Sequence, residues 1–491
     1  MVMTIGEQEV IGNHIAGREV PAACGRTRMK VAPATGQDLA LLVESDEQDV
    51  QAAVEAARAA QKEWAACSVL ERKKGLLAWA NNLRDIANDI SILDAHDSGS
   101  PIGHGKKGLL VGIRHLEHFA GLGYEITGET LPVTSGNLHL TVREPYGVVG
   151  ILTPFNHPSF FPIKLSAPAL AAGNAVILKP SEQTPLSATM IAHAAHGALP
   201  DGLVNVVHGG PAVGQAIVTH PGIQRLHLTG GVPTGLAIQE AAARSGYVKE
   251  ISLELGGKNP LIIFPDVDVK LAASTAVRGM NFDHQGQSCG STSRLFVHSS
   301  IAKEVTRLVV EQVSLITMGA PELEQTQMGS MVSRRHQERV LSLISSAVDE
   351  GAEVLVGGSA PEGALSCGAY VQPTVLGSVT ADMDVAKTEI FGPVLSVIEW
   401  EDEETMIEAV NSTEFGLTGA VYTNDITKAL RTASRIESGF VWVNGIERRW
   451  LGMPFGGYKN SGTSHEHARE TMISYTRKKS ISVILDPTTA I

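Results

Sequence analysis

The sequence predicts an α/β protein with two doubly wound parallel sheets, and three observations lead to this fold class. Strand-like apolar runs alternate with helix-length stretches, this alternation occurs in two successive regions, and glycine is in excess at 50 of 491 residues. Strands that are buried on both faces of a parallel sheet have near-continuous apolar sequences. Abundant glycine without repeats is typical of the tight turns and close backbone approaches of α/β enzymes.

The most regular alternation lies between residues 148 and 257. Its apolar runs are VVGILTP (148–154), NAVILKP (174–180), LVNVVHG (203–209), IQRLHLTG (223–230) and ISLELGG (251–257). The stretches between the runs are long enough for helices and lie at 158–172, 185–197, 211–220 and 232–245. Ligands bind beyond the carboxyl ends of the strands in such a sheet, so we expect the functional loops there.

The rest of the chain gives three further expectations. The first 120 residues or so read mainly as helices, with helical spacing at 50–63 and 70–93. After residue 257 a second α/β pattern has strands NPLIIFPD, SRLFVHS, AEVLVGG, AVYT and GFVWVNG and helices near 301–316, 333–350, 402–412 and 426–437. The ribbon near 125–145 and the tail at 480–486 alternate like edge strands, which are normally paired, and both are candidates for a subunit contact.

Composition narrows the class of protein. The net charge of −13 argues against a nucleic-acid partner, which would require a basic face. No uninterrupted apolar stretch is long enough to span a membrane, and the N-terminal residues lack the pattern of a signal peptide. Four cysteines without a CxxC pair are typical of the reducing cytoplasm. We therefore expect a cytoplasmic enzyme that binds neither nucleic acid nor membrane.

Three short segments contain residues suited to catalysis. Cys289 lies among small residues in GQSCGSTSR, where a thiolate would be accessible, although a buried structural cysteine is the alternative. Glu254 interrupts an apolar strand in ISLELGGKNP, so burial can raise its pKa toward that of a general base; pairing with Lys258 is the alternative. Asn156 in TPFNHP could donate its amide N–H to an oxyanion or could cap the next helix.

Two loops are suited to a nucleotide. The segment LTGGVPTG (228–235) runs from a strand through two glycines into a helix, whose first N–H groups can bind a pyrophosphate. The segment KPSEQTP (179–185) places Lys179 and Glu182 at a strand end, where they can hold ribose hydroxyls. A capping box that begins near Ser181 explains the second pattern equally well.

Taken together, these segments resemble the aldehyde dehydrogenase superfamily in order over nearly the full chain. The residues that carry the resemblance are TPFNHP, KPSEQTP, LTGGVPTG, LELGGKNP, GQSC, EIFGPV, WVN and PFGGYKNSG. Glu254 and Cys289 are 35 residues apart, close to the family interval. The resemblance implies a Rossmann-like NAD-binding domain (1–123 and 146–254), a catalytic domain (255–455), and an oligomerisation ribbon and tail (124–145 and 470–491) in a homodimer or homotetramer.

The resemblance also implies a mechanism. Cys289 would attack an aldehyde to give a thiohemiacetal, whose oxyanion Asn156 and the Cys289 N–H would hold. Hydride would pass to a nicotinamide, and Glu254 would activate the water that hydrolyses the resulting thioester to a carboxylic acid. The expected cofactor is NAD, with NADP possible, because a carboxylate at Glu182 repels a 2′-phosphate while Lys179 attracts one.

The resemblance assigns cofactor-binding residues position by position. The pyrophosphate would lie by Gly230 and by Gly231, where family members commonly have serine. The full set of expected cofactor-binding residues is Thr153, Pro154, Phe155, Lys179, Ser181, Glu182, Gly210, Gly214, Thr229, Gly230, Gly231, Leu255, Glu389 and Phe391.

The segment NGIERRWLGMPF (444–455) carries the clue to the aldehyde. Its arginines, Arg448 and Arg449, could form a basic mouth to an aromatic channel, which suggests an aldehyde with an aromatic or carboxylate group. A solvated rim or an inter-subunit salt bridge explains the arginines equally well. The expected substrate-binding residues are Phe160, Phe161, Arg449, Trp450 and Phe455, with Phe282 as a further aromatic wall.

Other interpretations remain open. A CoA-acylating semialdehyde dehydrogenase would use a thiol in place of water, but such enzymes typically lack the glutamate of ELGG. A cysteine esterase without a redox role would need a histidine base, and His284 is the nearest in sequence. We expect no metal site, read His157 as a packing or cap residue, and place His467 in a polar surface loop. Lys164 lies one position earlier than the lysine usual in the family.

Overall fold

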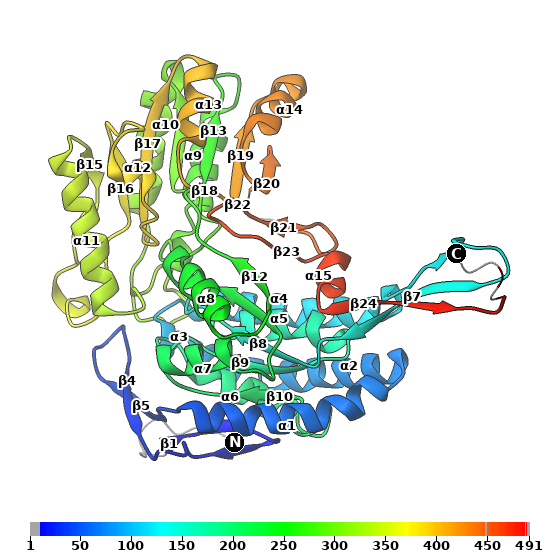
Figure 1. Ribbon diagram of the computed structural model, residues 1–491. Coiled ribbons are helices and arrows are strands. Elements are labelled where there is room, and N and C mark those ends of the chain that lie inside the picture. Colours follow the sequence, from blue (N-terminus) through cyan, green and yellow to red (C-terminus); the bar gives the residue numbers. More distant parts are fainter. Residues whose placement is uncertain (1–9, 447–448, 487, 489–491) are drawn as a thin grey trace.

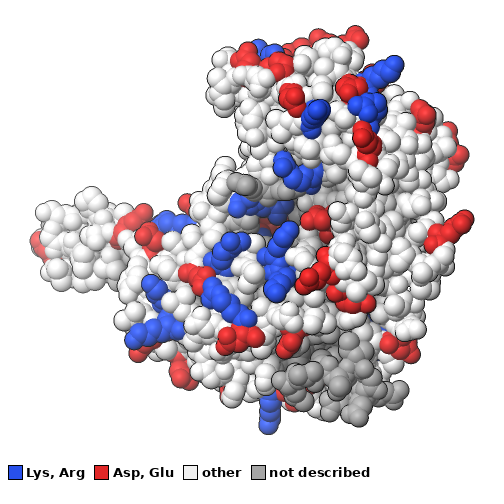
Figure 2. All heavy atoms as spheres, turned by 180° about the vertical axis from the view of Figure 1, so that it is seen from behind, with Lys and Arg blue, Asp and Glu red and all other residues white. Residues whose placement is uncertain are grey.

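The computed structural model describes residues 10–446, 449–486 and 488. Two lobes are stacked in the view of Figure 1, and a narrow β arm projects sideways from the lower one. On the opposite face, Lys and Arg side chains lie among Asp and Glu over both lobes (Figure 2). Within the described residues, no helix combines the length and the apolar character needed to cross a membrane.

The lower lobe is built on a seven-stranded sheet that confirms the first predicted alternation. Its order is β12 (Glu250–Glu254), β11 (Arg225–Thr229), β8 (Val148–Leu152), β9 (Ala175–Lys179), β10 (Val204–Val206), β2 (Asn13–Ile15) and β3 (Arg18–Val20). The first five strands are parallel, and β2 and β3 form an antiparallel edge. The helices that follow the strands are α5 (Phe160–Ala171), α6 (Leu186–His193), α7 (Pro211–Thr219) and α8 (Val232–Arg244).

The N-terminal region differs from the prediction, because residues 10–43 form strands. Besides β2 and β3, a separate sheet has the order β1 (Val10–Ile11), β5 (Asp38–Val43) and β4 (Thr27–Val31). These strands are too short for their alternation to stand out, and the alanine-rich helical pattern begins only after them. The helices then follow as α1 (Glu47–Ala66), α2 (Val69–Asp85), α3 (Ala87–Ser98), α4 (Ile102–Leu122) and the 3₁₀ turn η1 (Gly123–Glu125).

The upper lobe contains the second parallel sheet. Its order is β15 (Glu353–Val356), β16 (Thr374–Gly377), β17 (Val394–Trp400), β14 (Arg294–His298), β13 (Pro260–Ile263), β19 (Thr418–Tyr422) and β20 (Phe440–Val443), with only β15 antiparallel. β16 and β17 were not among the predicted strands. The helices are α9 (Val269–Gly279), η2 (Phe282–His284), α10 (Ser299–Ser314), α11 (Arg334–Asp349), η3 (Gly363–Leu365), α12 (Asp384–Lys387), α13 (Glu403–Asn411) and α14 (Ile426–Arg435).

The arm pairs two segments that were predicted as separate edge strands. β7 (Leu138–Pro145) lies between β24 (Thr476–Val483) and β6 (Thr130–Leu131), and β24 is antiparallel to β7 along its whole length (Figure 1). β24 is exposed beyond its first residue.

The C-terminal segment also returns from the upper lobe to the lower one. Its short elements are β18 (Phe415–Gly416) with β22 (Tyr458–Lys459), β21 (Phe455–Gly456) with β23 (His465–Glu466), and α15 (Arg469–Ile473). Gly462 forms a β-bridge with Glu254 at the end of β12, so the two lobes are joined at that strand.

Candidate active site

A cleft of about 1070 Å³ lies where loops of the lower lobe face the upper lobe. Loops at the carboxyl ends of β8, β9 and β11 line it, as the position of ligands in doubly wound sheets predicts. A cavity of this size can hold a dinucleotide-sized ligand. The predicted site residues that line it are Thr153, Pro154, Phe155, Asn156, Phe161, Lys179, Ser181, Glu182, Gly214, Thr229, Gly230, Gly231, Leu255, Cys289, Glu389 and Phe391.

Cys289 is half-buried in the loop between η2 and β14. Its carbonyl oxygen accepts a hydrogen bond of 2.7 Å from Asn259 Nδ2, which fixes the backbone beside the thiol. Burial raises the pKa of the Cys289 thiol, and the strongest opposing influence is the charge of Arg449. Access from the cleft argues against the alternative of an inert structural cysteine.

Asn156 lies in the loop that follows β8 and is 4% exposed. Its Nδ2 donates to the carbonyl oxygen of Gln287 over 2.9 Å, which leaves a second amide hydrogen on the same nitrogen. The capping alternative is wrong, because α5 begins at Phe160 with Ser159 as its N-cap and without a side-chain cap. The structure thus holds the Asn156 amide against the segment that carries Cys289.

Glu254 is the last residue of β12 and is 4% exposed. Burial, and then the neighbouring charge of Glu466, raises the pKa of Glu254 well above its ordinary value. Its hydrogen-bond partner is Ser464, whose Oγ donates to Glu254 Oε1 over 3.2 Å. The alternative pairing with Lys258 is not seen, since Lys258 Nζ is buried without a hydrogen-bond partner among the described residues.

A buried network behind Glu254 was missed by the sequence analysis. Glu466 forms an ion pair with Lys164 Nζ, and its Oε1 lies 3.1 Å from His227 Nε2. Burial alone would raise the pKa of Glu466, but Lys164 and His227 outweigh it and hold that pKa below its usual range. Two carboxyl groups with pKa values pushed in opposite directions are typical of acid–base chemistry.

The expectation that His467 lies on the surface is wrong. Its side chain is buried at 3% exposure, and its ring stacks on Phe455 with centroids 5.4 Å apart. The local sequence around His467 is polar, but the segment is buried because it passes between elements that are distant in sequence. No signal within the segment itself identifies Glu466 or His467 as part of the site.

The loop after β9 has the residue types that a ribose needs. Lys179 Nζ and Glu182 Oε2 are 3.6 Å apart, and burial lowers the pKa of Lys179. Arg28, from the N-terminal strands, donates from Nη2 to the Glu182 carbonyl oxygen over 2.9 Å. The capping-box alternative is wrong, because Ser181 Oγ accepts from the N–H of Gln183 in a turn and α6 begins without a side-chain cap.

The start of α8 is suited to a pyrophosphate. Gly231 is the N-cap and makes no side-chain cap. Pro233 has no N–H, and the Thr234 N–H already donates to the Gly231 carbonyl oxygen over 3.0 Å, so the Val232 N–H is the helical donor left for a ligand at the cleft. Thr153 Oγ1 is buried nearby in the cleft lining without a hydrogen-bond partner among the described residues. Gly210 does not line the cleft, and its N–H donates to Glu44 Oε1 over 2.8 Å.

Residues 389–391 form the opposite wall of the cleft, and several hydrogen bonds hold them in place. Glu389 Oε1 accepts from the N–H of Gly257 over 2.8 Å, and burial raises the pKa of Glu389 to about 7. Phe391 has a left-handed backbone with φ of 57°, which is unusual for a side chain of this size. His336 and Arg339 from α11 bond to the carbonyl oxygens of Phe391, Glu389 and Ile390. The amphipathic sequence of α11 gave no sign of this role.

Only some of the expected substrate-binding residues line the cleft. Phe161 lines the cleft, whereas Phe282 is buried in the apolar cluster of the upper lobe against which Cys289 packs. The buried rings of Phe160 and Phe455 and the 58% exposed Trp450 do not line the cleft. Arg448 lies outside the described residues.

Arg449 approaches the nucleophile loop. Its guanidinium lies 4.3 Å from the Phe455 ring centroid, and its Nη2 is only 2.1 Å from where a Cβ on Gly290 would be. Its Nε is buried without a hydrogen-bond partner among the described residues. Arg449 is therefore a cation placed beside Cys289 with donors still available.

Comparison with known proteins decides the family. The model of the aldehyde dehydrogenase family matches residues 21–481. The chain belongs to this family. Aldehyde dehydrogenase tropH of Talaromyces stipitatus is 40% identical over 466 residues, which cover 93% of this chain and 90% of that protein.

Solved aldehyde dehydrogenase structures have the same fold. The NAD⁺ complex of aldehyde dehydrogenase from Bacillus cereus matches with a TM-score of 0.94 and 36% identity over 97% of each chain. A 3,6-anhydro-L-galactose dehydrogenase in complex with NAP matches with a TM-score of 0.93 and 30% identity, over 97% of this chain and 100% of that chain. The predicted fold class is confirmed.

The aldehyde dehydrogenase described here is thus an oxidoreductase that oxidises aldehydes with NAD(P). The residues of the cleft fit that cofactor, since the Val232 N–H at the start of α8 and the Thr153 hydroxyl, which has no partner among the described residues, both lie at the cleft. The esterase alternative is not favoured, because the Nδ1 of His284 faces Ser100 Oγ at 3.2 Å and its ring packs on two other histidines.

Proposed function

We propose that Cys289 is the nucleophile of aldehyde oxidation. Its thiolate adds to the aldehyde carbon, a C–S bond forms, and the carbonyl π electrons become an oxyanion on the thiohemiacetal. The second amide hydrogen of Asn156 and the N–H of Cys289 are suited to hold that oxyanion. NAD held in the cleft would supply the hydride acceptor, and loss of hydride from the thiohemiacetal carbon would leave a thioester on Cys289.

We propose Glu254 as the general base for hydrolysis. Its carboxylate takes a proton from water, the oxygen attacks the thioester carbon, and the C–S bond breaks to release the acid and the thiolate. The raised pKa of Glu254 supports this role, because a base with a pKa nearer neutrality accepts a proton more effectively. Glu254 does not itself line the cleft, but its neighbour Leu255 does, and its charge acts on the Cys289 thiol. This buried carboxyl close to a cysteine that lines the cleft is the observation that carries the proposal.

The test is a measurement of NADH formation from NAD and an aldehyde panel without CoA. We expect turnover by the wild type, none by Cys289→Ala, and a single-turnover burst by Glu254→Gln followed by a steady rate about 10²- to 10⁴-fold lower. The hydrolysis rate of the wild type should rise with pH through the raised pKa of Glu254, because only the carboxylate accepts the proton. NADH formation only with CoA, or ester cleavage without NAD, would overturn the proposal.

We propose that the physiological aldehyde carries a carboxylate, and that an aromatic ring is compatible with it. Arg449 supports the charge, since its free donors lie beside the nucleophile loop. Phe161 supports the ring, because it lines the cleft that Cys289 also lines. We also propose NAD over NADP, since the Glu182 carboxylate can accept hydrogen bonds from a ribose 2′-OH and repels a phosphate.

Three further assignments complete the proposal. The predicted NAD-binding, catalytic and oligomerisation segments keep the boundaries given above. The arm is assigned to a homodimer or homotetramer contact, supported by the exposed apolar side chains of β7 and β24. A cytoplasmic location is supported by four free cysteines, which are Cys24, Cys67, Cys289 and Cys367.

A further inference from the structure

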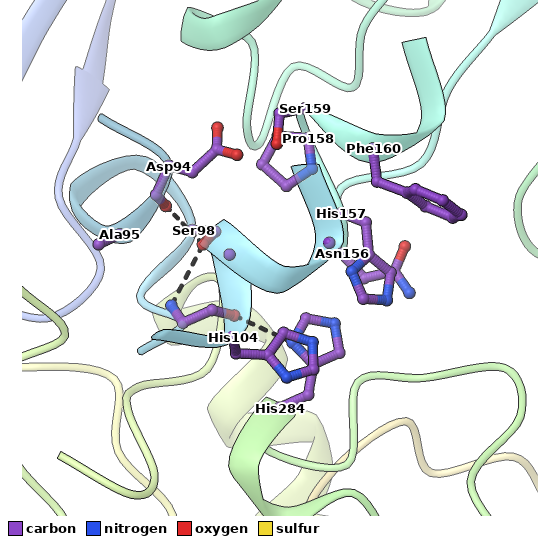
Figure 3. Close-up of a pocket in the computed structure, with 13 residues that line it drawn as sticks. Asp94, Ala95, Ser98, His104, Asn156, His157, Pro158, Ser159, Phe160 and His284 are labelled. Atoms are coloured by element: carbon purple, nitrogen blue, oxygen red, sulfur yellow. Dashed lines mark hydrogen bonds between the residues drawn. The ribbon is translucent and has the colours of Figure 1, made fainter. Parts of the chain in front are cut away.

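Three histidines from separate segments meet beside the active site. His104 comes from α4, His157 from the loop before α5, and His284 from η2. One ring nitrogen from each lies within 4.8 Å of the other two. Figure 3 shows the rings together, with His104 and His284 face to face, and their centroids are 4.1 Å apart. The centroid of His157 is 4.2 Å from that of His284.

Other polar groups orient two of the three rings. The Nδ1 of His284 lies 3.2 Å from Ser100 Oγ, and the Nδ1 of His104 lies 3.3 Å from a carboxylate oxygen of Asp283. Metal-binding histidines typically bond through one ring nitrogen to such a group while the other binds the metal. His284 is 1% exposed, and its Nε2 has no hydrogen-bond partner among the described residues. A buried ring nitrogen without a partner indicates a missing ligand.

We propose that His104, His157 and His284 form a binding site for a divalent transition-metal ion of the zinc class. Imidazole nitrogens suit Zn²⁺ and Co²⁺, and three histidines with one water complete a tetrahedral site. N–Zn bonds of ~2.0–2.1 Å place tetrahedral ligand nitrogens about 3.4 Å apart. The three nitrogens must therefore approach by an ångström or so. A metal binds in the plane of each imidazole, so the near-parallel rings of His104 and His284, 8° apart, must also rotate out of their stack about their side-chain torsions when the ion binds.

A metal at this site would connect three parts of the fold. α4, η2 and the loop that carries Asn156 contribute one ligand each, so the ion would cross-link elements from both lobes. Binding to the folded state alone raises the free energy of unfolding. The site is separate from the proposed chemistry at Cys289, and its existence does not depend on the roles proposed for Asn156 or Glu254.

The test is titration of the metal-free full-length protein with Co²⁺, followed by visible absorption and calorimetry. We expect one ion per chain, d–d bands of a nitrogen and oxygen ligand set, and a rise in Tm. His104→Gln and His157→Gln should each weaken binding by roughly 100-fold or more, since losing a direct ligand exceeds the 10- to 100-fold cost of losing a supporting group. Two ligand variants are used so that misfolding of one of them does not decide the test. Neither variant removes His284, whose ring is the most buried of the three.

His196→Gln is the matched control, because His196 is exposed and pairs only with Asp201, so its Co²⁺ affinity should equal that of the wild type. Cys289→Ser excludes the thiol as the ligand. Unchanged affinity in His104→Gln and His157→Gln, a thiolate-to-cobalt band that Cys289→Ser removes, or no binding to the wild type would each overturn the proposal.

Discussion

Arg449 has two effects at the site, and they can be separated. Its charge is the strongest influence that lowers the pKa of Cys289 against the effect of burial, so it favours the thiolate with every substrate. Its free donors act only on a substrate that carries an acceptor of opposite charge. A neutral aldehyde therefore reports the first effect, and an anionic aldehyde reports both.

We expect Arg449→Gln to raise KM for 4-carboxybenzaldehyde by roughly 10- to 100-fold, because a hydrogen bond to a charged group contributes about 1.5–3 kcal/mol. The same change should leave KM for benzaldehyde nearly unaltered while reducing alkylation of Cys289 by iodoacetamide at pH 7. Arg449→Lys retains the charge and should restore the alkylation rate. An equal rise in KM for both aldehydes would contradict the carboxylate hypothesis.

The choice between NAD and NADP is also argued from single residues. Lys179 and Arg28 are cations near Glu182, and Arg28 also pairs with Glu44 at 3.1 Å, so removing the Glu182 carboxylate leaves an excess of one positive charge. Glu182→Gln should raise kcat/KM with NADP by about 10-fold and lower it with NAD. Glu240→Gln, which removes an exposed carboxylate that pairs with Arg244, is the control for a general loss of negative charge. If Glu182→Gln leaves the NADP/NAD ratio unchanged, the carboxylate does not determine the preference.

At the scale of elements, the loop after β12 allows the opposite wall of the cleft to approach closely. A Cβ on Gly256 would lie 2.2 Å from Glu389 Oε2, and one on Gly257 would lie 2.8 Å from the Cys289 carbonyl oxygen. The glycine pair is therefore required by contact with two other segments. This is a packing constraint and not a conformational one, since neither glycine has a positive φ.

Gly256→Ala should displace Glu389 and weaken NAD binding by about 10-fold, which corresponds to about 1.4 kcal/mol. Calorimetric titration with NAD measures the change. In the Glu389→Ala background the clash is relieved, so adding Gly256→Ala should cost little more. Additive losses in the double variant would show that the alanine acts elsewhere.

How far the sequence predicts the elements depends on their length and periodicity. β8, β9 and β11 were predictable because buried parallel strands are continuous apolar runs between helices. β1–β5 were not, because strands of two to six residues show too few periods. The segments around Cys289 and Asn156 were identified from motifs. Glu466 is brought to the active site, and His104 to the histidine cluster beside it, only by tertiary packing.

At the scale of the whole molecule, the arm exposes strands that pair only with each other within the described part of the chain. Val133, Leu138, Ile481 and Val483 are exposed apolar residues on it or beside it. Exposed apolar strands are typical of surfaces that another chain covers. The arm projects away from both lobes in Figure 1 and contributes no residue to the cleft lining, so changes there leave the chemistry of one chain intact.

We expect the double substitution Leu138→Lys and Ile481→Lys to reduce the mass measured by light scattering toward that of a single chain. The two residues lie near the end of the arm, on adjacent strands, so the lysines place charge in one patch. Leu236→Lys, an exposed apolar position on α8, is the matched control and should leave the mass unchanged. A mass equal to that of the wild type would rule out the arm as the contact.

The bridge between Gly462 and Glu254 has a consequence for the order in which the enzyme matures. Ser461, Thr463 and Ser464 bond to the end of β12, and Glu466 follows directly. A polypeptide leaves the ribosome from its N-terminus, so the proposed base emerges some 200 residues before the groups that set its protonation. The nucleophile at Cys289 also emerges before them. Competence for hydrolysis is thus acquired at the end of synthesis, when almost the whole chain has been made.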